Sequence, residues 1–293
     1  MAKETTKKET KEVAVGTESS VPATQSSFSL ASLQAMAGAG LENVTMNDQS
    51  PPWLRALQAL SAQLKKSKPE YIEGAKAGMF FNTATQQVFD GEEGLILIPC
   101  HFEKRYLEYT AKKEGEQSKF VADHGTNSDV IADLKKEKFS WITAEGNVIS
   151  EVATYYVLQY DEKTGGVTRA ILSMPSSHAG KSRKWMSLIT NREIPKLDGT
   201  PGTFTPPIFF TAYRATIVAE TNGDNDWFTY KMVPYSDLVK VEKGQLVANI
   251  KNGDLVLEAA VKFNDLISKG QIEVQQPAED EHQGESSAAG DAF

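Results

Sequence analysis

The stretch YYVLQYDEKTGGVTRAIL, residues 155–172, decides the predicted fold. Its two ends, 155–160 and 167–172, are rich in aromatic and β-branched residues, and the middle contains Gly165 and Gly166. Two runs of this kind joined by a short glycine-containing turn are typical of an antiparallel β-hairpin. We therefore predict a pair of neighbouring strands here.

Further strand-like runs flank this hairpin on both sides, at residues 79–81, 95–98, 102–109, 139–143, 209–219 and 227–233. Turn-forming residues separate them, for example Asp90-Gly91 and Glu145-Gly146-Asn147. Strands do not alternate with helices, as a parallel Rossmann-like sheet would require. The predicted fold class is mainly β, a closed or partly open antiparallel barrel with accessory helices.

Three helices are predicted near residues 53–66, 180–190 and 254–269, because apolar side chains recur there at helical spacing. The shared apolar face of the last helix carries Leu255, Ala259, Phe263 and Leu266. Asp254 is the predicted N-cap of this helix, and Gly270 is predicted to end it.

The two ends of the chain differ in composition from its middle. Residues 1–50 are rich in Lys, Glu, Thr, Ser, Ala and Gly, which predicts a disordered N-terminal arm. Within this arm, residues 28–41 have apolar side chains spaced among small ones. This pattern fits either a linker or a segment that forms a helix on a partner. Residues 51–272 are predicted to form the β-rich domain, and residues 273–293 a disordered acidic tail.

The composition, with 40 % hydrophobic and 24 % charged residues, is that of an ordinary soluble protein. A single cysteine, Cys100, excludes an intramolecular disulfide. No apolar run is long enough for a transmembrane helix, and the charged N-terminus does not resemble a secretory signal. We expect an intracellular protein without membrane contact, in the cytoplasm of the host cell if the protein is viral.

The net charge of −8 is unevenly distributed along the chain. Residues 273–293 contain six acidic residues and no Lys or Arg, whereas residues 51–272 contain 27 basic and 27 acidic residues. Residues 169–196 carry six basic residues against the single acid Glu193. A neutral domain with a basic segment and an acidic tail is compatible with a nucleic-acid partner, although the total charge alone argues against one.

Motifs for catalysis are incomplete. Gly180-Lys181-Ser182 ends a segment that follows a predicted strand, but Pro175 stands where a phosphate-binding P-loop needs its first glycine. The four histidines are dispersed and form no metal-ligand spacing. We therefore expect no enzyme, no cofactor and no metal site, and keep an NTPase that uses Lys181 as a minor alternative.

Cations mixed with aromatic rings give the stronger signal. Single-stranded nucleic acid is held by cations along its phosphates and by rings stacked on its bases. The residues predicted to form such a surface are Lys104, Arg105, Tyr106, Tyr109, Arg169, Lys181, Arg183, Lys184, Trp185, Arg192 and Arg214. The alternative is that the rings belong to the core and that the basic helix face is only solvated.

The acidic tail ends in an aromatic residue, Phe293, which carries its own carboxylate. Such a tail can compete for a basic groove and can place its last ring in a partner's pocket. The residues predicted to bind a partner are Glu279, Asp280, Glu281, Glu285, Asp291 and Phe293. The alternative is a tail that only increases solubility.

The chain resembles single-stranded DNA-binding proteins of the bacteriophage replication type. The resemblance lies in the β-rich domain followed by an acidic tail that ends in Phe293, and in the segments YIEGAKAGMFFN (71–82) and LSMPSSHAGKSRKWMSLI (172–189). It implies an OB-fold core, sequence-independent binding of single strands, and tail contacts with a polymerase or a helicase-primase.

We therefore predict a non-enzymatic single-stranded DNA-binding protein of phage DNA replication or recombination, with homo-oligomers possible. The second hypothesis is a structural protein of the phage virion or of its assembly, with the polar N-terminus as an assembly arm.

Overall fold

The computed structural model describes residues 29–37, 39–40, 42, 51–111, 118–137, 140–221, 223, 226–272 and 274. The chain divides into two units, Met1–Val44 and Thr45–Phe293. In the first unit, residues 30–35 form the short helix α1 (Leu30–Ala35). Of the predicted N-terminal arm only residues 29–37, 39–40 and 42 are described, and of the predicted tail only Val274.

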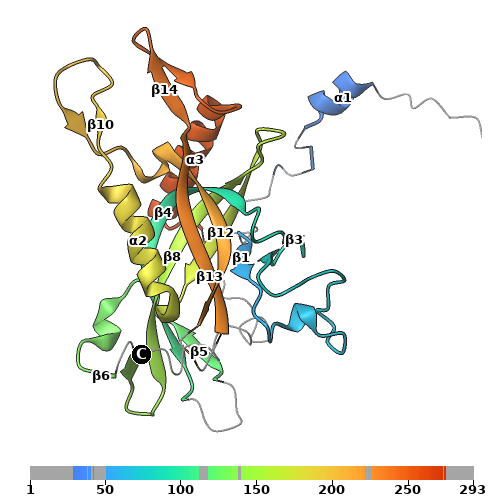
Figure 1. Ribbon diagram of the computed structural model, residues 1–293, viewed down its shortest axis with the longest axis vertical. Coiled ribbons are helices and arrows are strands. Elements are labelled where there is room, and N and C mark those ends of the chain that lie inside the picture. The colour runs from blue at the N-terminus through green and yellow to red at the C-terminus, as the bar shows by residue number, and fades with distance from the viewer. Residues whose placement is uncertain are drawn as a thin grey trace, which may run out of the picture. The chain divides into compact units, whose positions relative to one another are not determined.

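The second unit is built on one mainly antiparallel sheet that curls into a half-barrel (Figure 1). Its central path runs through β13 (Asp226–Asp237), β12 (Thr211–Thr221), β4 (Leu95–Tyr109), β8 (Val148–Tyr160), β9 (Val167–Met174), β1 (Trp53–Ala56), β2 (Phe80–Asn82) and β3 (Val88–Phe89). Three short strands extend it: β5 (Phe120–Asp123) on β4, β7 (Ser140–Ile142) on β8 and β6 (Lys135–Glu137) on β7. The prediction of a mainly β, antiparallel architecture is confirmed.

The predicted hairpin is present as β8 and β9. The two strands are antiparallel, with Tyr155 opposite Leu172 and Tyr160 opposite Val167. On its other side β8 pairs with β4 along nearly its whole length, from Tyr160 opposite Ile96 to Val148 opposite Tyr109. This long ladder lies in the middle of the sheet.

Each face of the ladder is covered by a helix. Successive strand residues point to opposite faces, so the ring of Tyr156 packs in a core with Phe263 of α3 (Gly253–Ser268), whereas Tyr155 packs in a second core with Trp185 of α2 (Ala179–Thr190). Because both faces are covered, residues 154–158 are all buried. This explains why residues 155–158 in β8 form a continuous apolar run instead of alternating with polar residues.

The prediction of a helix near residues 53–66 is wrong. Trp53–Ala56 form strand β1, which pairs in parallel with β9 and antiparallel with β2, and only the 3₁₀ turn η2 (Ala62–Leu64) is helical. The four residues of β1 are all buried. Burial and pairing between two strands therefore outweigh a helical spacing that is only a weak local preference.

The other two predicted helices are confirmed as α2 and α3, but the buried face of α3 is displaced by about one residue. The buried residues are Gly253, Val256, Ala260, Phe263 and Ile267, whereas Leu255 is 59 % exposed. The N-cap is Asn252, in the left-handed region, instead of the predicted Asp254, which lies in the first turn. Gly270 adopts a φ of +65° directly after the helix, as a helix-ending glycine does.

Two small hairpins and three 3₁₀ turns complete the domain. The hairpins are β10 (Ile194–Pro195) with β11 (Thr203–Phe204) and β14 (Val239–Glu242) with β15 (Gln245–Ala248). The 3₁₀ turns are η3 (Ser128–Ile131), η4 (Ser176–His178) and η5 (Ile208–Phe210). Among the described residues, no helix combines the length and the apolar character needed to cross a membrane.

Candidate nucleic-acid interface

Helix α2 carries three of the six basic residues of the segment 169–196, and Trp185 anchors the helix. The indole is completely buried; its ring stacks on Tyr155 at a centroid distance of 4.3 Å and meets Tyr213 edge-on at 5.9 Å. Beside it the hydroxyl of Tyr155 lies 2.9 Å from the hydroxyl of Ser182, and burial raises the pKa of Tyr155 to about 12. The prediction that Trp185 forms part of an open nucleic-acid-binding surface is wrong, because its ring is completely buried.

Ion pairs fasten both ends of α2 to the β12–β13 hairpin. Lys181, in the first turn, pairs with Glu220 of β12. Arg192, just after the last turn, makes a two-pronged contact with Asp237 of β13 and also donates to Thr211. Both cations are therefore held within the fold.

Arg183 and Lys184 differ from these two cations. Both side chains are exposed on the outer side of α2. No carboxylate among the described residues lies within ion-pair distance of either one. Of the residues predicted to bind nucleic acid, these two present their charge to solvent without an ion-pair partner in the described part of the chain.

The predicted cations of β4 form ion pairs, and one of its predicted rings is buried. Lys104 pairs with Glu151 at 3.1 Å, and Arg105 pairs with Asp123 at 2.9 Å. Tyr106 is 7 % exposed and packs edge-on against Trp141, so its predicted place in an open groove is wrong. Tyr109 is half-buried against Phe120.

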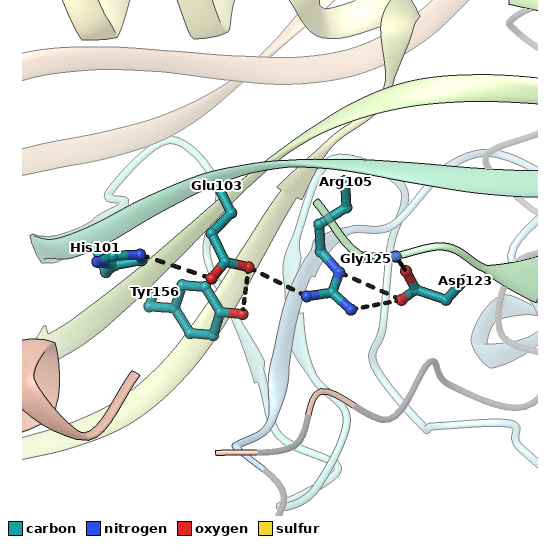
Figure 2. Close-up of polar contacts among 6 residues, drawn as sticks. All are labelled: His101, Glu103, Arg105, Asp123, Gly125 and Tyr156. Carbon is teal, nitrogen blue, oxygen red and sulfur yellow. Dashed lines mark hydrogen bonds and ion pairs between the residues drawn. The ribbon is translucent and has the colours of Figure 1, made fainter. Parts of the chain in front are cut away.

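Arg105 belongs to a chain of polar contacts along one face of β4 (Figure 2). It donates to Glu103 at 3.1 Å, which also accepts from the hydroxyl of Tyr156 at 3.0 Å and lies 3.6 Å from the ring of His101. The other ring nitrogen of His101 reaches Asn264 of α3 at 3.1 Å. The network therefore ties β4 and β8 to α3.

The protonation states in this network follow from its contacts. The nearby carboxylate of Glu103 raises the pKa of His101, and partial burial opposes this effect. Partial burial alone would raise the pKa of Glu103, but the contact with His101, the hydrogen bond from Tyr156 and the charge of Arg105 outweigh it and lower this pKa. The carboxylate is thus held ionised.

Arg169 and Arg214, distant in sequence, line the same pocket of about 790 Å³. It opens where β4 begins and β8 ends, beside the β2–β3 turn. The guanidinium of Arg214 donates to Glu162 at 3.2 Å and to the carbonyl of Glu93 at 3.2 Å. Arg169 lies 5.4 Å from the ring centre of Phe263.

A smaller hollow of about 290 Å³ lies at the C-terminal end of α2. Leu188, Arg192 and Tyr235 are among its lining residues. Tyr235 is 38 % exposed, and the guanidinium of Arg214 lies 5.3 Å from the centre of its ring. The Arg214–Tyr235 contact therefore joins the hollow beside α2 to the larger pocket.

The sequence matches the family model described as Pam3 phage gp34-like protein over residues 23–273. The chain belongs to this family. Comparison with the curated proteins and with the solved structures found no match. The family match covers every strand of the sheet and the helices α1, α2 and α3.

In this member of the gp34-like family, the predicted site residues fall into three places. Arg183 and Lys184 lie on α2, Arg169 and Arg214 in the pocket, and the residues of β4 at the far end of the β4–β8 ladder. Within the described ranges, no group of His, Cys, Asp and Glu is arranged to hold a metal ion. The six predicted tail residues lie outside the described residues.

Two residues of the pocket region were missed from the sequence. Glu162 lies in the β8–β9 turn and Tyr235 near the end of β13, and both contact Arg214. An acid in a turn and a ring at a strand end carry no local signal of a site. Only the position of Arg214 between them reveals the arrangement.

Proposed function

We propose that this protein binds single-stranded DNA without regard to sequence, in phage DNA replication or recombination. The observation that carries the proposal is the exposed pair Arg183 and Lys184 on α2, which have no ion-pair partner in the described part of the chain. The phage protein in the family's description supports the viral setting.

The mechanism follows from how α2 is mounted. Because Trp185 is buried beneath it and both of its ends are held by ion pairs, the helix keeps the backbone of Arg183 and Lys184 in a fixed place. The two exposed side chains can adjust from there to the phosphates of a flexible strand. The strand continues past the hollow at Tyr235, whose partly exposed ring offers a stacking surface for a base.

The curled antiparallel sheet also supports the proposal. Proteins that bind single strands commonly use OB folds, which are small curled antiparallel sheets. We propose that the half-barrel serves the same purpose, although it has more strands and contains the parallel pair β1–β9. In the same proposal the tail, through Phe293, recruits a polymerase or a helicase-primase.

The test is binding of a fluorescent oligothymidine by the full chain, followed by anisotropy at increasing salt. We expect the double variant Arg183→Ala/Lys184→Ala to weaken binding and to reduce the salt dependence by about one to two phosphate contacts. The matched control, Lys65→Ala/Lys66→Ala, removes the same charge from exposed residues near η2. It should change binding only slightly.

Two results would contradict the proposal. One is a wild-type protein that does not bind the oligothymidine at low salt, which would favour the virion or assembly role. The other is an equal loss in the α2 variant and in its control, since that would reduce the effect to total charge. Thermal unfolding of each variant checks that the fold is intact.

A further inference from the structure

The pocket of about 790 Å³ has the size and lining of a site for a small polar ligand. Ligand pockets in proteins commonly have volumes of about 300–1,000 Å³. Its walls combine two rings, Phe89 and Tyr160, with three cations, Lys163, Arg169 and Arg214, and with the carboxylates of Glu93, Asp161 and Glu162. Rings and cations together suit a ligand that has both a planar base and a phosphate.

The carboxylate of Glu162 already occupies two hydrogen-bond donors, one on Arg214, which lines this pocket, and one on Tyr235, which lines the neighbouring hollow. Glu162 accepts from the guanidinium of Arg214 at 3.2 Å and, with its other oxygen, from the hydroxyl of Tyr235 at 2.6 Å. The hydrogen bond from Tyr235, followed by the contact with Arg214, lowers the pKa of Glu162. The donors are therefore arranged around an anion with two accepting oxygens, a geometry that a phosphate shares.

The turn that carries Glu162 is held independently of this contact. The carboxylate of Asp161 accepts from the backbone of Lys163 at 2.9 Å and from the hydroxyl of Thr164 at 2.7 Å. On the side of α3, Asn252 donates to the carbonyl of Gly165 at 3.3 Å. The side chain of Glu162, which is 46 % exposed, can thus leave the donors by rotating into solvent while the turn stays in place.

We propose that the pocket binds the phosphate and base of one nucleotide, and that Glu162 is a resident competitor that occupies the phosphate position on Arg214 and Tyr235. A nucleotide phosphate replaces the carboxylate on these donors, and the base enters the pocket toward Phe89. This inference deepens the proposed function, on which it rests for the source of the nucleotide, a single strand or a free mononucleotide.

The experiment compares the full chain with Glu162→Gln, which keeps the side-chain shape but removes the competing charge. Titration calorimetry with thymidine monophosphate and anisotropy with an oligothymidine distinguish the free from the strand-borne nucleotide. We expect Glu162→Gln to tighten binding of at least one of them about two- to fivefold, the effect of removing one exposed ion pair. Glu92→Gln is the matched control, because Glu92 is an exposed neighbour that does not line the pocket.

Removal of the donor should act in the opposite direction. Arg214→Ala is expected to weaken the same ligand at least about tenfold, as loss of a charge-assisted hydrogen bond does. Thymidine, which has no phosphate, should not distinguish Glu162→Gln from Glu92→Gln. If Arg214→Ala does not fold, Tyr235→Phe removes one donor and keeps the ring.

The inference is overturned if Glu162→Gln and Glu92→Gln change the affinity for both ligands equally. This result is distinct from failure of the proposed function, which is measured on α2. Oligothymidine binding that depends on Arg183 and Lys184 but not on Glu162 would support the proposed function and exclude the pocket as part of the DNA-binding site. Binding of the monophosphate with no binding of the oligothymidine would support the pocket and contradict the proposed function.

Discussion

At the scale of single residues, Trp185 shows how burial changes what a substitution reports. The ring is completely buried between Tyr155 and Tyr213, in the core under α2. We predict that Trp185→Ala destabilises the protein by about 3–5 kcal/mol, because it leaves a large cavity. Denaturant unfolding measures this loss. Any reduction in oligothymidine binding should follow the unfolded fraction; a well-folded variant with weak binding would contradict the burial.

His101 provides a pH-dependent contribution at the same scale. Its pKa is raised by the nearby carboxylate of Glu103, so the folded state binds the proton more tightly than the unfolded state. The resulting stability is fully present below the ordinary histidine pKa of about 6.5 and is lost as pH rises through the raised value.

We therefore predict that His101→Gln flattens the decrease in unfolding free energy between about pH 6 and pH 8. Denaturant unfolding at a series of pH values, with the wild type in parallel, checks this. An unchanged slope in the variant would show that other groups carry the pH dependence.

At the scale of elements, the start of α3 depends on close packing rather than on helix propensity. In an exposed helix, replacing glycine by alanine stabilises by about 1 kcal/mol. At Gly253, however, an added Cβ would overlap the carbonyl oxygen of Leu238. We predict that Gly253→Ala destabilises the protein, measured as a lower midpoint of thermal unfolding. A higher midpoint would mean that the helix can shift away from Leu238.

The same contrast between local preference and packing explains why β1 and the buried face of α3 differ from the prediction. The spacing of Trp53, Leu54 and Leu57 favours a helix locally, but pairing with β2 and β9 makes the first two part of a strand. In α3 the period is correct and the predicted face is displaced, because position relative to the sheet, not the period, decides that Val256 is buried and Leu255 is exposed.

At the scale of the whole molecule, charge is divided between a neutral domain and an acidic tail. In the proposed function the tail competes with DNA for cations such as Arg183 and Lys184. We predict that a chain ending at Pro277, which lacks the last five acidic residues, binds oligothymidine more tightly, most clearly at low salt. Anisotropy titrations of the two chains measure the difference. Weaker binding by the shortened chain would exclude competition by the tail.

The sequence by itself determined the mainly β class, the β8–β9 hairpin and two of the three predicted helices. These features depend on local periods and turn residues, which a single sequence contains. Only the tertiary structure decided that Trp185 and Tyr106 are buried, that Lys181 and Arg192 are held in ion pairs, and that Arg214 meets Glu162 and Tyr235. Exposure and pairing depend on residues brought together from distant strands, and no local pattern contains that information.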